Sequence, residues 1–210
     1  MKLYDFEPAA NAKRVRMFIA EKGIEVPIVE CNVRADDQFK EPFNTMNPFH
    51  CVPFLETDSG EVIAESISIC RYLEELYPEP SLFGDTAEER GIIDMWNRRV
   101  ELDGFMPALH ALRNHVPTFE GKVVPGTRND LPQLPAMVKR GKEMLDIFLG
   151  RLEAHMATNE FIAGSNISIA DITCYFVLNM ANTFEMGIEN KYPNTHRWHQ
   201  EFSKRPSTNA

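Results

Sequence analysis

The strand signals of this sequence lie before residue 78, and a proline-bearing segment separates them from a helical remainder. Four short runs are rich in β-forming residues, at 2–6, 26–32, 52–57 and 61–65. Apolar residues at helical spacing predict helices over 11–22 and 66–77. Asp58-Ser59-Gly60 is typical of a hairpin turn between the last two runs. The order predicts an α/β domain with a mixed four-stranded sheet.

The rest of the chain predicts an all-helical domain. Residues 79–85 form an expected linker between a domain of residues 1–78 and one of residues 86–210. Thr86 and Glu89 have the spacing of a capping box that opens a long helix, and Gly104 with Pro107 predicts a bend in it. Further helices are expected near residue 137, from Ser168 and near residue 195. The buried side of the first of these is expected at Met137, Met144, Phe148 and Leu152.

Charge and cysteine usage restrict the classes of partner. The chain has 22 Lys and Arg against 31 Asp and Glu, a net charge of −9, which disfavours binding to nucleic acid or anionic membranes. No apolar run approaches the ~20 residues of a membrane helix, and the start of the chain does not resemble a signal peptide. The cysteines are widely spaced, at Cys31, Cys51, Cys70 and Cys174. We therefore expect reduced thiols and a cytoplasmic location.

The segment 47–55 is the most informative stretch. Pro53 enters a predicted strand directly, where proline removes a ladder donor. One interpretation is a cis bond after Val52, which would turn the amide and carbonyl of Val52 toward an extended peptide. The alternative is an ordinary proline on an edge strand.

Glu65 and Ser66 lie where a predicted strand meets a predicted helix. Ser66 suits the first positions of the helix, where hydroxyl and amide donors and the helix dipole favour a carboxylate. Glu65 supplies a negative charge for an ammonium group. Together they suit the zwitterionic end of an amino acid, although simple helix capping by Ser66 also explains the pattern.

With these motifs, the chain resembles the cytosolic glutathione S-transferase superfamily along nearly its whole length. Asn47-Pro48 with Val52-Pro53-Phe54-Leu55 matches the family's cis-proline segment, and Glu65-Ser66 matches its γ-glutamyl-binding pair. Ser168-Ile169-Ala170-Asp171 matches its buried N-capping box, whose role is structural. The resemblance implies a thioredoxin-like N-terminal domain followed by an all-α C-terminal domain.

The resemblance implies a glutathione site formed by Asn11, Phe39, Lys40, Cys51, Val52, Pro53, Glu65 and Ser66. Val52 would hold the cysteinyl part, and Glu65 with Ser66 the γ-glutamyl group. Phe39 and Lys40 would lie near the glycine end, where Lys40 could pair with the carboxylate. Cys51 would either form a mixed disulfide with glutathione or simply fill space.

The family's activating hydroxyl is missing. Alignment of the first helix places Ala9 at the usual Ser position and Asp5 at the Tyr position, and neither is a neutral hydroxyl donor. Asn11 is the remaining candidate, because a side-chain amide and the helix amides near it can stabilise a thiolate. Helix capping by Asn11 is the alternative.

The implied function is a glutathione S-transferase that presents the thiolate of its co-substrate to a hydrophobic electrophile with weak conjugating activity. A glutathione-dependent disulfide reductase and a non-catalytic binding module of the same fold are the alternatives. Met106, His110 and Arg113 share a helical face that could border the acceptor, with core packing the alternative for Met106 and surface exposure for the others. A homodimer is implied, and no metal is expected.

Overall fold

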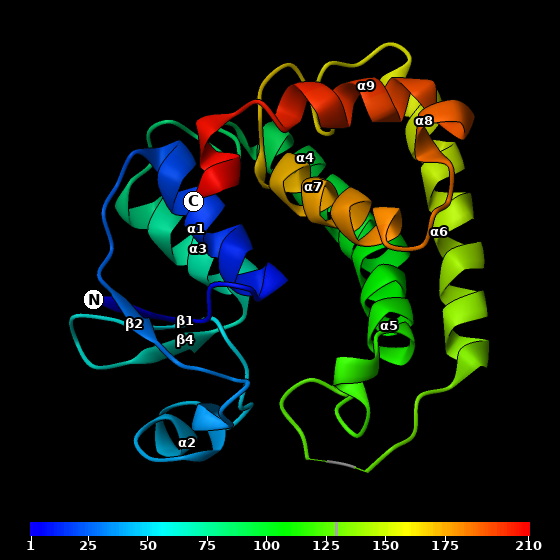
Figure 1. Ribbon diagram of the computed structural model, residues 1–210. Helices are drawn as coiled ribbons and strands as arrows, with labels where there is room; N and C mark the ends of the chain where they lie inside the picture. Colours follow the sequence, from blue (N-terminus) through cyan, green and yellow to red (C-terminus); the bar gives the residue numbers. More distant parts are fainter. Residues whose placement is uncertain (129) are drawn as a thin grey trace. The chain divides into compact units, whose positions relative to one another are not determined.

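The computed structural model describes residues 1–128 and 130–210, which divide into two compact units. The first unit contains Met1–Pro80, Pro125–Thr127 and Pro206–Ala210, and the second contains Ser81–Val124 and Arg128–Arg205 (Figure 1). Among the described residues, the first unit carries all four strands and the second is helical. The expected mixed sheet followed by a helical domain is therefore confirmed.

The sheet of the first unit has the order β2-β1-β3-β4. Its strands are β1 (Lys2–Asp5), β2 (Ile28–Glu30), β3 (Phe54–Glu56) and β4 (Val62–Ala64). β1 runs parallel to β2 and antiparallel to β3, and β4 runs antiparallel to β3. The sheet is mixed because the hairpin at its end is joined by a tight turn while β1 and β2 need a helical crossover.

Helices cover both faces of this sheet. α1 (Ala10–Lys22) and α3 (Ser66–Leu76) pack together on one face (Figure 1). On the other face Tyr4 and Phe54 stack with ring centroids 4.6 Å apart, and Phe43 from α2 (Phe43–Met46) packs edge-on against Tyr4. Alternation along β1 explains the arrangement, because neighbouring side chains of a strand point to opposite faces.

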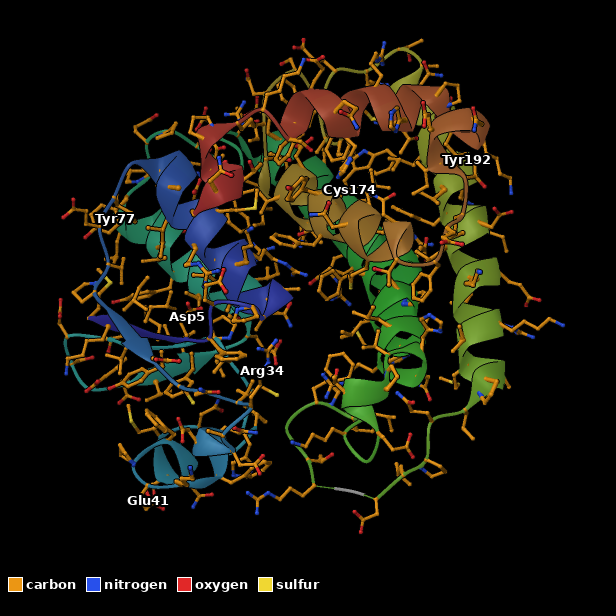
Figure 2. The ribbon with its side chains drawn as sticks, in the orientation of Figure 1. Asp5, Arg34, Glu41, Tyr77, Cys174 and Tyr192 are labelled. Atoms are coloured by element: carbon orange, nitrogen blue, oxygen red, sulfur yellow. The ribbon has the colours of Figure 1, made fainter. Side chains whose placement is uncertain are left out.

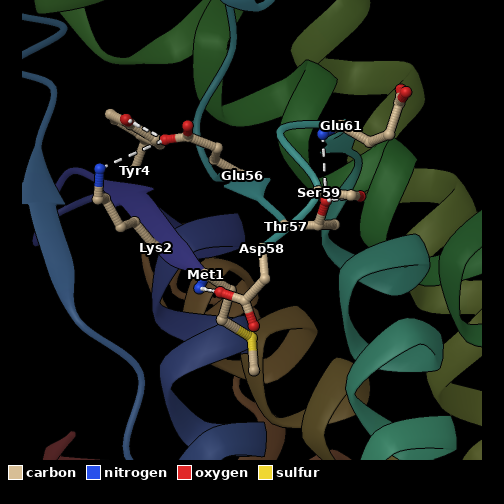
Figure 3. Close-up of polar contacts among 8 residues, drawn as sticks. All are labelled: Met1, Lys2, Tyr4, Glu56, Thr57, Asp58, Ser59 and Glu61. Carbon is tan, nitrogen blue, oxygen red and sulfur yellow. Dashed lines mark hydrogen bonds and ion pairs between the residues drawn. The ribbon is translucent and has the colours of Figure 1, made fainter.

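Polar contacts fix the hairpin against β1 (Figure 3). Tyr4 donates a hydrogen bond of 2.8 Å to the Glu56 carboxylate, and the amino terminus pairs with Asp58. Burial and this bond to Glu56 raise the pKa of Tyr4 to about 12. The Thr57 hydroxyl accepts the amide of Glu61 at 3.1 Å, which closes the turn.

The second unit is built from α-helices that range from four to 22 residues in length. They are α4 (Ala87–Arg99), α5 (Met106–His115), α6 (Pro135–Met156), α7 (Ile169–Asn182), α8 (Ile188–Lys191) and α9 (Pro193–Phe202). At the position of the expected bend, a π-helical segment, Val100–Phe105, joins α4 to α5. Its Gly104 lies so close to Phe148 and Val177 that a Cβ there would approach the Phe148 ring to 2.9 Å. No helix in the described part of the chain is long and apolar enough to cross a bilayer.

The expected buried face of α6 is wrong in part. Phe148 and Leu152 are buried, but Met137 is 38 % exposed and Met144 is 42 % exposed. The buried stripe instead consists of Gly141, Leu145, Phe148, Leu149, Leu152 and Met156. Gly141 allows this face to approach α5 closely, since a Cβ there would meet the Pro107 carbonyl at 2.7 Å.

Two helices begin with a capping box, as their sequences predict. Thr86 and Glu89 form an exposed box at the start of α4. In the buried box of α7, Asp171 accepts hydrogen bonds from the amide and hydroxyl of Ser168 at 2.9 Å each. Its second oxygen accepts the amide of Ile162 at 2.8 Å. Burial raises the pKa of Asp171 to about 6 although these bonds act in the opposite direction.

Candidate functional site

The register of the sheet brings the candidate residues of the first unit to one edge. Tyr4 pairs with Phe54, and Phe54 pairs with Ala64, so the end of β1, the start of β3 and the end of β4 lie at the same edge. α1 follows the end of β1, the loop 47–53 precedes β3, and α3 follows β4. Segments far apart in the sequence therefore meet here because of the strand directions alone.

The loop before β3 presents a free peptide group. The bond between Val52 and Pro53 is cis. The buried side chain of Asn47 orders the loop, since it accepts the amide of Phe49 at 3.1 Å and donates to the Cys51 carbonyl at 2.8 Å. Within the described residues neither the amide nor the carbonyl of Val52 has a hydrogen-bond partner. The Val52 peptide groups can therefore pair with an extended ligand.

The start of α3 combines hydrogen-bond donors with a negative charge. Glu65 precedes the helix with a φ of +71°, a left-handed conformation that is uncommon for glutamate and is found often at functional sites. Its side chain is exposed, whereas Ser66, the first helical residue, is 5 % exposed. No side chain caps this helix end, so its first amides remain available to a carboxylate.

The start of α1 offers a second set of donors. Ala9 occupies the N-cap position and no side chain caps the helix. Asn11 is therefore inside the first turn and half-buried, and the capping alternative for it is wrong. The nearby Asp5 is occupied by a buried ion pair with Arg16, which also donates to the Glu7 carbonyl at 2.8 Å.

Three other expected residues lie in the same unit but are partly occupied. The Lys40 ammonium donates to Asp37 at 2.9 Å and to the Ala35 carbonyl at 2.7 Å. The hydrogen bond from Lys40 lowers the pKa of Asp37. Phe39 packs against His50 with ring centroids 4.9 Å apart, and Cys51 is half-buried.

Arg34 was not among the site residues predicted from the sequence. A cavity of about 470 Å³ lies beside the end of β1 and is lined by Asp5, Phe6, Glu7, Pro8, Ile28, Glu30, Asn32 and Arg34. Asp5 and Arg34 lie near each other at this end of the sheet (Figure 2). The Arg34 guanidinium is 5.6 Å from the centre of the Phe6 ring. The sequence offered one signal for Arg34, because it is a basic residue that follows the predicted strand 26–32.

The expected acceptor residues lie in the second unit, on α5. Met106 is 40 % exposed, so the core-packing alternative for it is wrong. His110 is exposed. Arg113 is half-buried because its guanidinium donates to the Lys122 and Val123 carbonyls and lies over the Phe119 ring at 4.6 Å.

The chemistry of the first unit suits a small peptide with one zwitterionic end. Val52 offers a strand-like peptide group, Glu65 and Ser66 offer a charge and donors, and the start of α1 offers amides that favour an anion. Among the described residues no group of three or more His, Cys, Asp or Glu side chains is arranged to hold a metal ion.

Comparison with family models gives two matches. Residues 3–81 match the model of the glutathione S-transferase N-terminal domain. Residues 107–206 match the model of the glutathione S-transferase C-terminal domain.

Individual relatives agree with these models. A glutathione S-transferase of class Gtt2 from Vibrio parahaemolyticus is 33 % identical, with a TM-score of 0.85 over 100 % of this chain and 96 % of its own. A glutathione S-transferase domain-containing protein from Marinobacter aquaeolei is 30 % identical, with a TM-score of 0.89 over 99 % and 100 %. Glutathione S-transferase 2 of Saccharomyces cerevisiae is 28 % identical over 99 % of this chain and 87 % of its own.

Proposed function

Because the chain belongs to the glutathione S-transferase family, we propose that it binds glutathione at the sheet edge described above and presents its thiolate to an electrophile. The observation that supports this most is the free Val52 peptide group beside the starts of α1 and α3. Those three features correspond to the cysteinyl backbone, the thiol and the γ-glutamyl end of the tripeptide.

Binding would use groups that are already in place. The Val52 amide and carbonyl pair with the cysteinyl residue in strand fashion. Ser66 and the first amides of α3 bind the γ-glutamyl carboxylate, and Glu65 binds the ammonium. Lys40 forms an ion pair with Asp37. It would therefore attract the glycine carboxylate of glutathione through its positive charge, or bind that carboxylate directly after the pair with Asp37 is broken.

Activation would fall to Asn11 and the first amides of α1. In this proposal the Asn11 side chain donates to the sulfur, and the helix dipole favours the thiolate over the thiol. Each effect lowers the thiol pKa from its ordinary value of about 8.5. The family's hydroxyl donor is absent in this proposal, and the loss of one good donor to the anion costs about 1–3 kcal/mol, so the expected conjugating activity is weak.

The Asn11→Ala variant is expected to raise the thiol pKa of bound glutathione and to lower kcat/KM about tenfold, since one hydrogen bond to an anion is lost. Thiolate absorbance, titrated against pH with glutathione bound, measures the first effect. A chlorodinitrobenzene assay measures the second. Asn11→Ser, which restores a donor, is the matched control and should recover part of the shift. An unchanged thiol pKa in Asn11→Ala would remove this role from Asn11.

We also propose which residues contact the electrophile and that the protein is a homodimer. Met106, His110 and Arg113 would border a hydrophobic electrophile, with Met106 as the apolar contact. The site is proposed to work in a homodimer, which sedimentation of the purified protein measures directly. The four free cysteines suit the reducing cytosol in which we place the enzyme.

A further inference from the structure

A short segment from the chain between α5 and α6 belongs to the first unit. Residues Pro125–Thr127 group with Met1–Pro80, whereas the residues before and after them group with the helical unit. The segment therefore has more of its contacts with the first unit than with the second. The contacts of Gly126 identify the seat of the segment as the loop Phe49–Cys51, directly before Val52.

Gly126 approaches this loop as closely as a backbone can. A Cβ at position 126 would overlap the carbonyl oxygen of Phe49 and would lie 2.8 Å from the Cys51 sulfur. Gly126 also has a φ of +69°, which favours glycine. Both its conformation and its surroundings therefore exclude a side chain.

The loop itself has little freedom to yield. Both polar ends of the buried Asn47 side chain are bonded to it, one to the Phe49 amide and one to the Cys51 carbonyl. The His50 amide adds a bond of 3.0 Å to the Asn47 carbonyl. A side chain at position 126 would therefore displace the segment 125–127 rather than the loop.

We propose that Gly126 is a positioning residue of the glutathione site, because its close seat on Phe49–Cys51 holds the loop that presents Val52. The expected effect on glutathione binding rests on the proposed function, whereas the contact of Gly126 with the loop does not depend on it. The segment restricts the motion of the loop before the ligand arrives, so less ordering remains for the ligand to impose. It also covers part of Cys51.

Gly126→Ala is expected to weaken glutathione binding about tenfold, as measured by calorimetry, because loop ordering is then imposed by the ligand. Gly121→Ala is the matched control. Gly121 lies in the same connection with a φ of +67°, but nothing lies within 4 Å of a Cβ there. Both substitutions meet similar backbone strain, and only the first removes the seat.

Alkylation by iodoacetamide gives a readout that does not need glutathione. Cys31, Cys70 and Cys174 are 0 % exposed and Cys51 is half-buried, so the native protein should react first at Cys51. Gly126→Ala should raise that rate several-fold over wild type and over Gly121→Ala, which peptide mass mapping assigns to the residue. Melting curves verify that both variants are folded.

The outcomes separate the two proposals. A faster Cys51 reaction in Gly126→Ala with weaker glutathione binding supports the inference. Suppose that Cys51 reacts faster in Gly126→Ala but that neither the wild type nor either variant binds glutathione. This result would support the contact of Gly126 with the loop, and it would contradict both the role of Gly126 in the glutathione site and the proposed function. Equal reaction rates and equal affinities for all three proteins would overturn the inference and leave the proposed function intact.

Discussion

Replacement of Asp171 with alanine is expected to lower the free energy of unfolding by about 3–5 kcal/mol. The carboxylate is fully buried and accepts hydrogen bonds from the Ser168 amide, the Ser168 hydroxyl and the Ile162 amide. Alanine would leave two buried amides without an acceptor, and each such loss costs about 1–3 kcal/mol. Denaturant unfolding followed by circular dichroism measures the change.

Glu89→Ala is the matched control, because Glu89 has the same place in the exposed capping box of α4. Water replaces the lost acceptor there, so the expected cost is about 1 kcal/mol or less. Both variants are compared at pH 7.5, where Asp171, with a pKa of about 6, is ionised in the folded protein. If the two substitutions lowered the free energy of unfolding equally, burial of the α7 capping box would add nothing to its contribution to stability.

The second large effect is expected at Ser66. Ser66→Ala removes a hydroxyl donor at the start of α3, and the proposed ligand group there is a carboxylate. A hydrogen bond to a charged group contributes about 1.5–3 kcal/mol, so the dissociation constant for glutathione should rise about 10- to 100-fold. Calorimetry with glutathione measures this change directly.

Ser68→Ala provides the comparison, because Ser68 lies on the same helix and is exposed. It should bind glutathione with the affinity of the wild type. If Ser66→Ala also kept that affinity while its melting temperature was unchanged, the γ-glutamyl carboxylate would have to bind elsewhere.

Local sequence patterns predicted several elements correctly. The hairpin turn at Asp58-Ser59-Gly60, the end of α1 at Lys22 and the capping boxes at Thr86 and Ser168 all lie where the sequence predicts them. These features depend on a few neighbouring residues, since turn conformation and capping are satisfied within one or two turns of chain.

Features that depend on distant neighbours were less predictable. Met137 and Met144 are apolar, as expected of a buried helix face, yet both are exposed. The face of α6 that packs closely against α5 is the one that carries Gly141. The sequence alone could not exclude Asn11 as the N-cap of α1, which the structure places at Ala9. Arg34 follows the predicted strand 26–32, but this local pattern alone does not show that Arg34 lines the cavity beside the end of β1.

Propensity, capping and motif spacing are local properties, and they were enough to predict the order of elements, the helical character of the second unit and the residue types of the candidate site. The positions of Asn11, Val52 and Ser66 at one sheet edge, and the contact of Gly126 with Phe49–Cys51, follow from the folded chain alone. Strand register and backbone contact join residues that are tens of positions apart, and no local pattern carries that information.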